Sequence, residues 1–393
     1  MQIYDWIVIG GGITGAALSY ELQNAGFSVL VLERDRQLEG ASKLSYGGVP
    51  FWAGTNQIMR QLCREGLAKH QQLSAELGFD TQFRNLDLLL TISPQDDPVL
   101  QAESFGQLEF PPALLSTQQS LELEPLLNLE AIAGSWHFPH AHANPLAVCE
   151  AYKKAFLRLG GSWINQQVLE LTAESVITER AEYACAQIAV CVGGLSRNLL
   201  GQSGIQTKLY FTHCEVLETE SLDLELRTMV MPASNERLGL ESRISQPDLE
   251  LFWRNQQSLP EAGLSSLSID VGAIQFSDRS IKIGQPSYVH PNPEFKFDLK
   301  ENERTLRDRV GQILPKLADL PATYSHCLVA FSSDSLPLIG ALPELPNTYL
   351  FTSFTSPMIY APPLAQRFAQ ALAQGAGLDK DRLLTQFSPL RFS

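Results

Sequence analysis

The chain of 393 residues has 44% hydrophobic and 18% charged residues, which is typical of an ordinary folded protein long enough for two substantial cores. Its formal net charge of −14 works against binding to phosphate backbones or anionic lipid surfaces, because that attraction requires clustered Lys and Arg. Nucleic acid is therefore not an expected partner.

The first pattern, DWIVIGGGITGAALSYELQNAGFSVLVLERD at residues 5–35, predicts a strand, a tight turn, a helix and a second strand. Its glycines form G-x-G-x-x-G, in which the first allows the sharp turn, the second lets the backbone approach a pyrophosphate, and the third brings helix against strand. The helix N-terminus then faces the phosphates, where its dipole and free N–H groups favour negative charge. The pattern predicts dinucleotide binding, with contacts from Gly10, Gly12, Ile13, Thr14 and Gly15.

Glu33 ends the second strand of this unit, where a carboxylate can accept both hydrogen bonds of an adenosine ribose. A carboxylate there would repel a 2′-phosphate, so NADP is disfavoured, whereas FAD and NAD both remain open. A glycine-rich turn without a ligand is the alternative, but the strand, helix and acid all fall where the motif needs them. Arg34, the next residue, is a further predicted contact.

The segment GASKLSYGGVPFW, residues 40–52, is rich in small residues and precedes the next helical pattern. Such a loop would cover the diphosphate of a bound cofactor, with Ser42, Lys43 and Ser45 as polar contacts. A plain surface turn is the alternative.

Residues 85–140 and 205–325 hold the short stretches LDLLLTI, LYFTHCEVLET, LELFWR and SIKIG between polar and proline-rich linkers, as expected for antiparallel strands. Three histidines, His137, His140 and His142, lie close together in WHFPHAHANP. Their spacing brackets a proline, and no acidic or cysteine ligand lies nearby in the sequence. We therefore predict no metal site.

With these motifs in place, the chain resembles the FAD-dependent D-amino-acid oxidase superfamily, in the branch that holds glycine oxidase, sarcosine oxidase and D-amino-acid dehydrogenases. The resemblance covers nearly the whole chain. It is carried by GGGITG with the acid and arginine after the second strand, the GAS…GGV segment, residues 141–171, IAVCVGGLS and DSLPLIGALPELPNTYLFTS. The last is the most specific, because no common structural need produces it.

The resemblance implies an α/β fold in which a Rossmann-like FAD-binding domain is joined to a substrate domain built on a mostly antiparallel sheet (α+β). The FAD-binding domain would comprise residues 1–84, 141–204 and 326–393. The substrate domain would comprise residues 85–140 and 205–325.

The same resemblance implies that FAD binds in an extended form and that NAD has no role. Backbone groups at Val168 would hold the adenine, and Gly193 and Gly194 would permit close approach at a strand end. The further implied contacts are Ser42, Lys43, Ser45, Gly47, Gly48, Cys327, Thr355, Ser356, Pro357 and Met358.

In such enzymes the flavin takes a hydride from the carbon beside an amine, water hydrolyses the imine, and oxygen or a quinone reoxidises the flavin. Lys282 resembles the lysine of sarcosine oxidase that promotes oxygen reduction, because a cation beside the ring stabilises charge developing on oxygen. The alternative is an outward-facing lysine between inward-facing Ile281 and Ile283. His213 and Tyr210 are candidates either to contact substrate or to satisfy the core.

Cys327 stands seven residues before Asp334, the spacing at which sarcosine oxidase carries the cysteine bonded to its flavin. The alternative is a buried small hydrophobic residue. His326 beside it would assist thiolate formation or cap a strand.

The sequence departs from the family pattern at the substrate site. Many members place an arginine that clamps the substrate carboxylate where this chain has Val329, and Arg254 or Lys43 are the candidates to replace it. TSFTSPM replaces the glycine-rich segment before the last helix, and its proline cannot donate a backbone hydrogen bond. A bulkier or less charged amine is therefore expected, in a pocket lined by Tyr46, Phe354 and Tyr360, with Met358 nearby.

The sequence thus predicts an FAD-dependent oxidoreductase that oxidises the C–N bond of an amino acid or secondary amine, with oxygen as acceptor and hydrogen peroxide as product. The alternatives are an FAD dehydrogenase of a 2-hydroxy acid, a quinone-linked amine dehydrogenase, or a flavin-binding protein with a degenerate pocket. No apolar run reaches the roughly 18 to 20 residues that span a bilayer, and residues 1–5 show no leader pattern. The six scattered cysteines indicate free thiols, so we expect a cytoplasmic monomer or small homo-oligomer.

Overall fold

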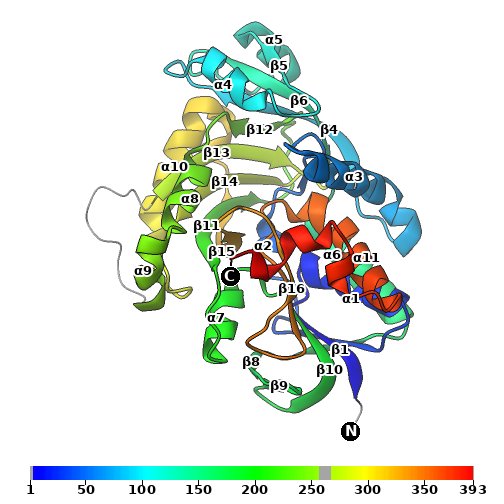
Figure 1. Ribbon diagram of the computed structural model, residues 1–393. Helices are drawn as coiled ribbons and strands as arrows, with labels where there is room; N and C mark the ends of the chain where they lie inside the picture. The colour runs from blue at the N-terminus through cyan, green and yellow to red at the C-terminus, as the bar shows by residue number, and fades with distance from the viewer. Residues whose placement is uncertain (1–2, 256–266, 393) are drawn as a thin grey trace.

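The computed structural model describes residues 3–255 and 267–392, which are organised around two β-sheets (Figure 1). The first sheet, in the lower half of Figure 1, has the order β16-β17-β10-β1-β2-β7, and the β8–β9 hairpin is attached to β10. All neighbours on this path pair in parallel except β16 and β17. The strands are β1 (Tyr4–Ile9), β2 (Val29–Glu33), β7 (Ser162–Asn165), β8 (Val168–Leu171), β9 (Ser175–Thr178), β10 (Glu182–Val190), β16 (Leu338–Ala341) and β17 (Thr348–Thr352).

Apolar side chains cover both faces of this first sheet, as is usual for parallel strands. On one face, Trp6 and Val8 of β1 and Phe351 of β17 join a core with four helices. These helices are α1 (Ile13–Asn24), α3 (Gln57–Leu77), α6 (Pro145–Arg158) and α11 (Pro357–Ala373). The predicted Rossmann-like architecture is confirmed.

The second sheet, in the upper half of Figure 1, has the order β15-β11-β14-β13-β12-β4-β6-β3, with β5 on β6. Its neighbours pair antiparallel except for β12 and β4, which confirms the predicted mostly antiparallel sheet. The strands are β3 (Gly48–Val49), β4 (Arg84–Ile92), β5 (Ala113–Leu115), β6 (Gly134–His142), β11 (Leu209–Thr219), β12 (Met229–Pro232), β13 (Leu267–Gln275), β14 (Ile281–Tyr288) and β15 (Ala322–Ser332).

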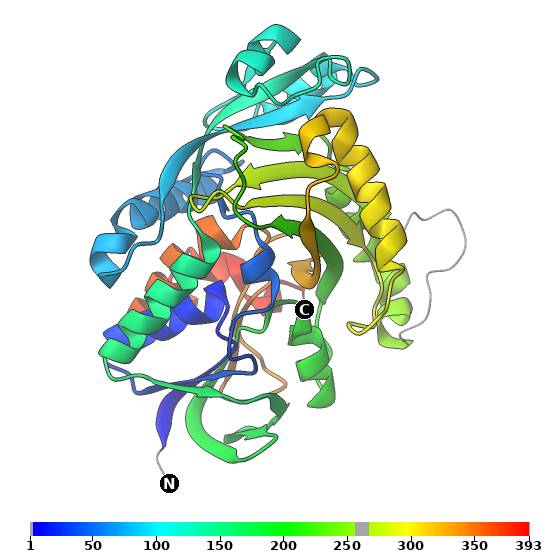
Figure 2. The same ribbon diagram turned by 180° about the vertical axis from the view of Figure 1, so that it is seen from behind.

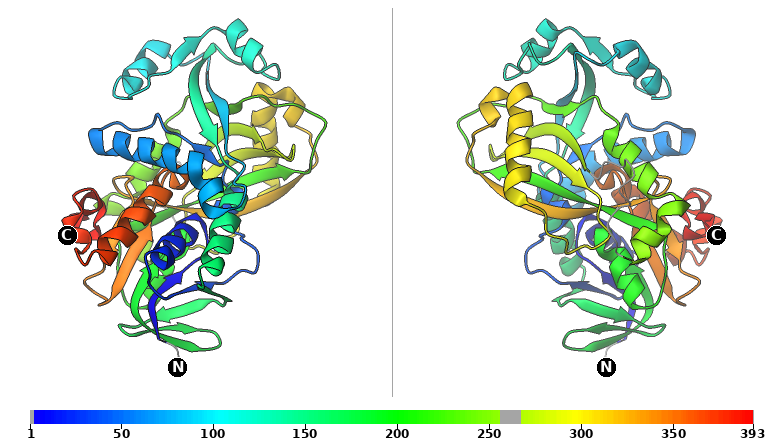
Figure 3. Two further views of the ribbon diagram at one scale, coloured as in Figure 1. Left: turned by 90° about the vertical axis from the view of Figure 1, so that its right-hand side faces the viewer. Right: turned by 90° about the vertical axis from the view of Figure 1, so that its left-hand side faces the viewer.

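Helix α10 (Leu299–Ile313) covers one face of the second sheet (Figure 2). Its Leu306 and Val310 pack against Leu217, Ile281 and Ile283 of the sheet. The opposite face of β11 therefore remains for contacts with the rest of the molecule. Figure 3 shows α4 (Pro98–Phe105), β5 and α5 (Thr117–Leu123) at the top, at the far end from the N-terminus. The other helices are α2 (Ala41–Leu44), α7 (Ser196–Gln202), α8 (Glu236–Ile244) and α9 (Glu250–Asn255).

Two expectations about this second part differ from the structure. Residues 249–254, LELFWR, are not a strand but the end of a 3-10 turn followed by α9. Leu249, Phe252 and Trp253 lie at helical spacing and share one buried cluster. An apolar run this short fits the two-residue period of a strand as well as the 3.6-residue period of a helix, so the sequence alone does not distinguish them. The expected domain boundary at residue 326 falls inside β15, which pairs with β11 along its whole length.

Across residues 3–255 and 267–392, no helix combines the length and apolar character needed to cross a membrane.

Candidate cofactor and active site

A cavity of about 610 Å³ lies between the two sheets and is lined by residues from both. One part is formed by the β1–α1 turn and the end of β2, and another by β11, β14 and β15. Its size falls within the range of about 300 to 1,000 Å³ that is usual for small-molecule and cofactor sites.

The turn between β1 and α1 is built so that only glycine fits at two positions. Gly10 has a positive φ of +97°, and a Cβ there would lie 2.7 Å from the Cys191 carbonyl oxygen. A Cβ on Gly15 would lie 1.9 Å from the Gly10 carbonyl oxygen. Gly12 caps α1 without any side-chain acceptor, and the Ile13 N–H donates to Ser42 Oγ at 3.0 Å. The first turn of α1 therefore presents amide groups at the cavity, where a phosphate is a suitable acceptor.

The carboxylate of Glu33 is held rigidly at the end of β2. Its Oε2 accepts the Gly11 N–H at 2.5 Å and its Oε1 accepts the Asp35 N–H at 2.9 Å. The side chain lines the cavity. Each carboxylate oxygen can accept a second hydrogen bond, so Glu33 retains capacity for two ribose hydroxyls.

The loop between β17 and α11 forms another wall of the cavity. Ser353 adopts a positive φ of 65° and is 1% exposed, and its Oγ has no hydrogen-bond partner among the described residues. Ser353 lines the cavity, so a bound group is the natural partner for this hydroxyl. Together with the glycine turn and Glu33, it makes the cavity fit a dinucleotide cofactor such as FAD.

Most of the cofactor contacts predicted from sequence lie on this cavity. The lining includes Gly10, Gly12, Ile13, Thr14, Glu33, Arg34, Ser42, Ser45, Val168, Gly193, Gly194, Cys327, Thr355, Pro357 and Met358. The predicted contacts outside the lining are Gly15, Lys43, Gly47, Gly48 and Ser356.

Those outside the lining have other partners. Gly15 packs against the Gly10 carbonyl, and Gly47 and Gly48 lie against the rings of His142 and His140. Lys43 Nζ pairs with Glu39 at 2.8 Å. The three glycines are therefore packed against the protein itself, and the Lys43 ammonium is paired outside the cavity.

Lys282 lies on the cavity side of the second sheet, although its side chain is not part of the lining. Lys282 pairs with Glu218 of β11, and Gly284 pairs with Val216. Because side chains alternate between the two faces of a sheet, Lys282 is on the same face as Val216, which lines the cavity. Its Nζ donates to the carbonyls of Lys43 and Ser45, with Glu218 at 3.7 Å. Lys282 is thus neither outward-facing nor open to the cavity, since the backbone of 43–45 lies over its ammonium group.

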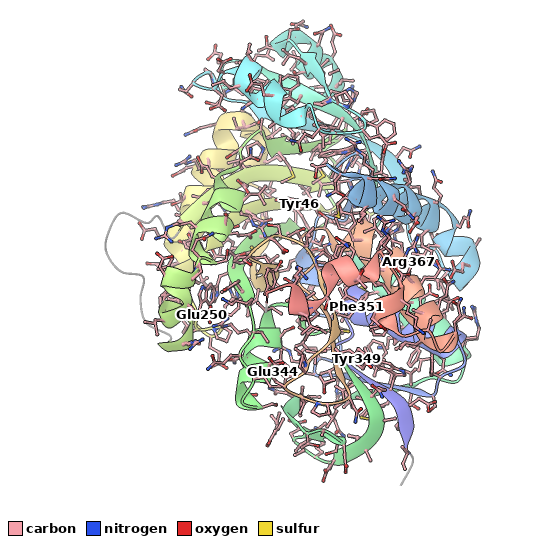
Figure 4. The ribbon with its side chains drawn as sticks, viewed as in Figure 1. Tyr46, Glu250, Glu344, Tyr349, Phe351 and Arg367 are labelled. Carbon is pink, nitrogen blue, oxygen red and sulfur yellow. The ribbon has the colours of Figure 1, made fainter. Side chains whose placement is uncertain are left out.

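His213 and Tyr210, the other two candidate catalytic residues, lie outside the lining. His213 directly precedes Cys214 on β11, so its side chain lies on the opposite face of the sheet. Its Nδ1 lies 2.9 Å from His326 Nε2. The Tyr210 hydroxyl donates to Glu250 at 3.0 Å. Glu250 is the first residue of α9, and Figure 4 shows it well away from Tyr46. Both residues satisfy core contacts, so their positions do not support direct substrate contact.

Of the three predicted pocket residues, Tyr46 and Phe354 line the cavity and Tyr360 does not. Tyr360 points between α11 and α3, where its hydroxyl lies 3.7 Å from Cys63 Sγ. Tyr360 is on the first turn of α11. Met358, two residues earlier on the same turn, lines the cavity instead.

Cys327 lines the cavity directly opposite Cys214 on the neighbouring strand. Burial raises the pKa of its thiol, so the nucleophilic thiolate is scarce at neutral pH. We therefore expect acid precipitation to release the flavin into the supernatant, and Cys327→Ser to retain FAD like the unmodified chain. Flavin absorbance of pellet and supernatant measures this. Colour that stays with the polypeptide but is lost in Cys327→Ser would instead assign a covalent bond.

Three buried histidines outside the cavity lining make the stability of the fold depend on pH. His70 Nε2–H donates to the Met358 carbonyl at 2.6 Å, and burial lowers the pKa of His70 to about 4. Burial likewise lowers the pKa of His140 to about 4 and of His142 to about 3. An unfolded histidine has a pKa of about 6.5, so between pH 6.5 and 4 the unfolded chain binds more protons than the folded one.

The free energy of unfolding should therefore fall as pH is lowered from 6.5 towards 4, by up to about 3 kcal/mol for each of these histidines. Thermal melting of the holoprotein at several pH values measures the loss. His70→Gln keeps an N–H donor but does not titrate, so its melting temperature should fall less steeply with pH. An unchanged slope in His70→Gln would contradict this account.

The sequence did not point to two polar residues of the cavity lining, Arg237 of α8 and Gln285 of β14. Arg237 and Glu241 stand four residues apart, a pattern typical of a solvated helix face, so no local signal separates Arg237 from a surface arginine. No group of three or more potential metal ligands occurs in the part of the chain that the structure describes.

The comparisons with known proteins agree with this geometry. A family model described as "FAD dependent oxidoreductase" (DAO) matches residues 5–371. The 4-methylaminobutanoate oxidase (formaldehyde-forming) of Paenarthrobacter nicotinovorans is 23% identical over 97% of this chain, and the alignment covers 45% of that protein. The glycine oxidase of Bacillus licheniformis is 26% identical over 68% of this chain and 79% of its own length.

Among solved structures, glycine oxidase from Geobacillus kaustophilus superposes with a TM-score of 0.77 over 99% of this chain and 98% of that one, at 18% identity. This likeness establishes the shared fold. The chain spans less than half the length of the first of these relatives, the 4-methylaminobutanoate oxidase.

Proposed function

This chain belongs to the FAD dependent oxidoreductase family DAO, and from that premise we propose that it oxidises the C–N bond of an amino acid or a secondary amine to an imine. Family membership confirms the predicted cofactor, FAD, and the predicted class, an oxidoreductase. The observation that carries the proposal is the single cavity that joins the dinucleotide turn to Tyr46, Gln285, Arg237 and Phe354.

FAD, when bound, would supply the hydride-accepting chemistry of the reaction. The amides at the start of α1 would hold its phosphates, and Glu33 would hold its ribose. At the substrate end, Phe354 and Met358 line the cavity with apolar surface and are 5% and 2% exposed, which limits access of water. Tyr46 is fixed there by a hydrogen bond from its hydroxyl to the Gly272 carbonyl at 3.3 Å.

We further propose oxygen as the acceptor and hydrogen peroxide as the product. The support is the position of Lys282 on the cavity side of the sheet, where its positive charge favours negative charge that develops on oxygen. The proposed reaction requires a small-molecule amine or amino acid as substrate. We expect the protein to be a cytoplasmic monomer or small homo-oligomer.

One experiment tests the central proposal. The purified holoprotein is mixed anaerobically with amino acids, N-methyl amino acids and 2-hydroxy acids, and loss of the yellow flavin absorbance is followed. Bleaching by an amine, followed by peroxide formation on admission of air, is the expected result. A protein purified without flavin, or bleached by no amine, would contradict the proposal.

The rival functions give different results in the same experiment. A 2-hydroxy acid dehydrogenase would be bleached by hydroxy acids, and a quinone-linked amine dehydrogenase would be bleached by amines but form little peroxide in air. A flavin-binding protein with a degenerate pocket would retain its colour with every substrate. The family arginine replaced by Val329 motivates the last of these.

A further inference from the structure

Two cysteines face each other across neighbouring strands in the wall of the cavity. Cys214 of β11 is directly opposite Cys327 of β15 in the antiparallel register, and both belong to one buried cluster. They are 2% and 6% exposed, and both line the cavity as free thiols. A small molecule in the cavity therefore has access to two neighbouring thiols that are almost closed to bulk solvent.

The spacing of this pair is suitable for a disulfide bond. Residues directly opposite one another on antiparallel strands have Cα atoms about 4.5 to 5.5 Å apart, within the range of about 4.4 to 6.8 Å found in disulfides. The Cβ atoms of a disulfide lie about 3.5 to 4.5 Å apart, at the near end of the cross-strand range. Because β15 is the end strand of the second sheet, it can shift towards β11 without breaking a pairing to another described strand.

The sulfur of Cys214 is surrounded by groups that favour a thiolate. Gln285 Nε2 donates a hydrogen bond to Cys214 Sγ at 3.3 Å. The hydroxyls of Ser287 and Thr212 lie 3.6 and 3.7 Å from the same sulfur. Burial opposes the charge of Arg237, but a thiolate at Cys214 raises the pKa of its guanidinium, so the two charges stabilise each other. Donors and a neighbouring cation of this kind make a cysteine nucleophilic.

Cys327 is suited to a different role. Burial raises the pKa of its thiol, so it reacts slowly with an oxidant on its own. Its place beside Cys214 gives it a high effective concentration towards a Cys214 sulfur that has already been oxidised. Burial also raises the pKa of the other thiols, which are those of Cys63, Cys149, Cys185 and Cys191.

We propose that Cys214 and Cys327 are a peroxide-reactive dithiol, which hydrogen peroxide converts to a disulfide in the wall of the cavity. The Cys214 thiolate attacks one peroxide oxygen and the O–O bond breaks, which leaves a sulfenic acid on Cys214 and a hydroxide that takes up a proton. The Cys327 sulfur then attacks the oxidised Cys214 sulfur, the S–O bond breaks, and the hydroxide leaves as water with the Cys327 proton. Two thiols and one hydrogen peroxide thus give one disulfide and two water molecules.

The oxidant links this site to the proposed function, but the inference does not depend on that function. A chain that forms hydrogen peroxide from an amine and oxygen would expose the dithiol to its own product inside the cavity. Peroxide added from outside is an equally good oxidant, so the dithiol is testable whatever the substrate. The disulfide would cross-link β11 to β15 and take the Cys214 sulfur out of its hydrogen bond with Gln285.

The test counts thiols in the native FAD-containing protein. The protein is reduced, desalted, treated with a few equivalents of hydrogen peroxide, and then denatured with an alkylating reagent that labels every free thiol. The chain has six cysteines, and we expect peroxide to remove two of the free thiols. Peptide mapping should find Cys214 linked to Cys327, and dithiothreitol should restore all six thiols. This mapping uses the unmodified chain and therefore needs no variant.

Single variants separate the two roles. Cys214→Ser should keep its remaining thiols in the presence of peroxide. Cys327→Ser should accumulate a sulfenic acid on Cys214, which dimedone traps, because no neighbouring thiol resolves it. Cys185→Ser is the matched control, because Cys185 is half-buried whereas the other five cysteines are buried. If exposure alone set the reactivity, Cys185 would be oxidised first. Cys185→Ser should still form the disulfide between Cys214 and Cys327.

Phenylarsine oxide gives a second measurement that involves no oxidation, because its arsenic binds two neighbouring thiols at once. One equivalent should bind to each unmodified chain. Binding should weaken at least about tenfold in Cys214→Ser and in Cys327→Ser.

The inference is overturned if six thiols survive peroxide, if the disulfide joins another pair, or if Cys185 alone is oxidised. It is also overturned if phenylarsine oxide binds either serine variant as tightly as the unmodified chain. Failure of the proposed function looks different. No amine would then bleach the flavin, while added peroxide would still join Cys214 to Cys327.

Discussion

Gly15→Ala should yield protein without bound FAD. The added Cβ would lie 1.9 Å from the carbonyl oxygen of Gly10, which is itself fixed by the turn at φ +97°. Neither atom belongs to a flexible side chain, so α1 must move away from the turn. Overpacking of a buried contact costs about 1 to 3 kcal/mol, and here it also displaces the amides that hold the phosphates.

The ratio of flavin to protein absorbance after purification measures this effect, and we expect it to fall at least about tenfold. Gly201→Ala on α7 is the matched control, because a Cβ there meets nothing within 4 Å. It should bind FAD normally and gain up to about 1 kcal/mol of stability from better helix propensity. Full flavin content in Gly15→Ala would show that the turn does not hold the cofactor.

The sequence predicted those parts of the fold and site whose residues lie close to one another along the chain. Gly10, Gly15 and Glu33 lie within one strand-turn-helix-strand unit, and each has a position-specific physical role. A reader of the sequence can therefore place them before any long-range contact is known.

The orientation of Lys282 could not be predicted in this way. Alternation predicts an outward lysine only if one face of the strand is solvated, whereas Ile281, Lys282 and Ile283 are all buried here. The pairing of Lys282 with Glu218 across β11 decides which face it occupies, and that register is a long-range property.

Arg237 shows the same limit more strongly. Its helix carries no motif, and its ion pair with Glu241 is what an exposed helix also shows. Arg237 reaches the cavity only because α8 packs beside β13. Another part of the cavity wall is formed by Tyr46, which is more than a hundred residues earlier in the chain.

Lys282→Met is expected to slow reoxidation of the reduced flavin by oxygen by about 100- to 1,000-fold, the effect of removing one preorganised charge that stabilises a developing anion. Burial lowers the pKa of Lys282, but Glu218 and two backbone carbonyls support its charged form. The methionine keeps the length of the stem and removes the charge. Anaerobic reduction by an amine should change only a few-fold, because the negative charge that a hydride brings is spread over the flavin ring system, whereas the charge that develops on oxygen is localised.

Stopped-flow absorbance separates the two half-reactions, with Lys208→Met as control because Lys208 is exposed just before β11. Loss of the ammonium group also frees the carbonyls of Lys43 and Ser45, so a loosened 40–52 loop is a competing explanation. Lys282→Arg tests it by restoring a charge of different shape, and should recover much of the oxygen rate. Equal slowing of both half-reactions in Lys282→Met, with no recovery in Lys282→Arg, would assign Lys282 to support of the loop and remove the argument for oxygen as acceptor.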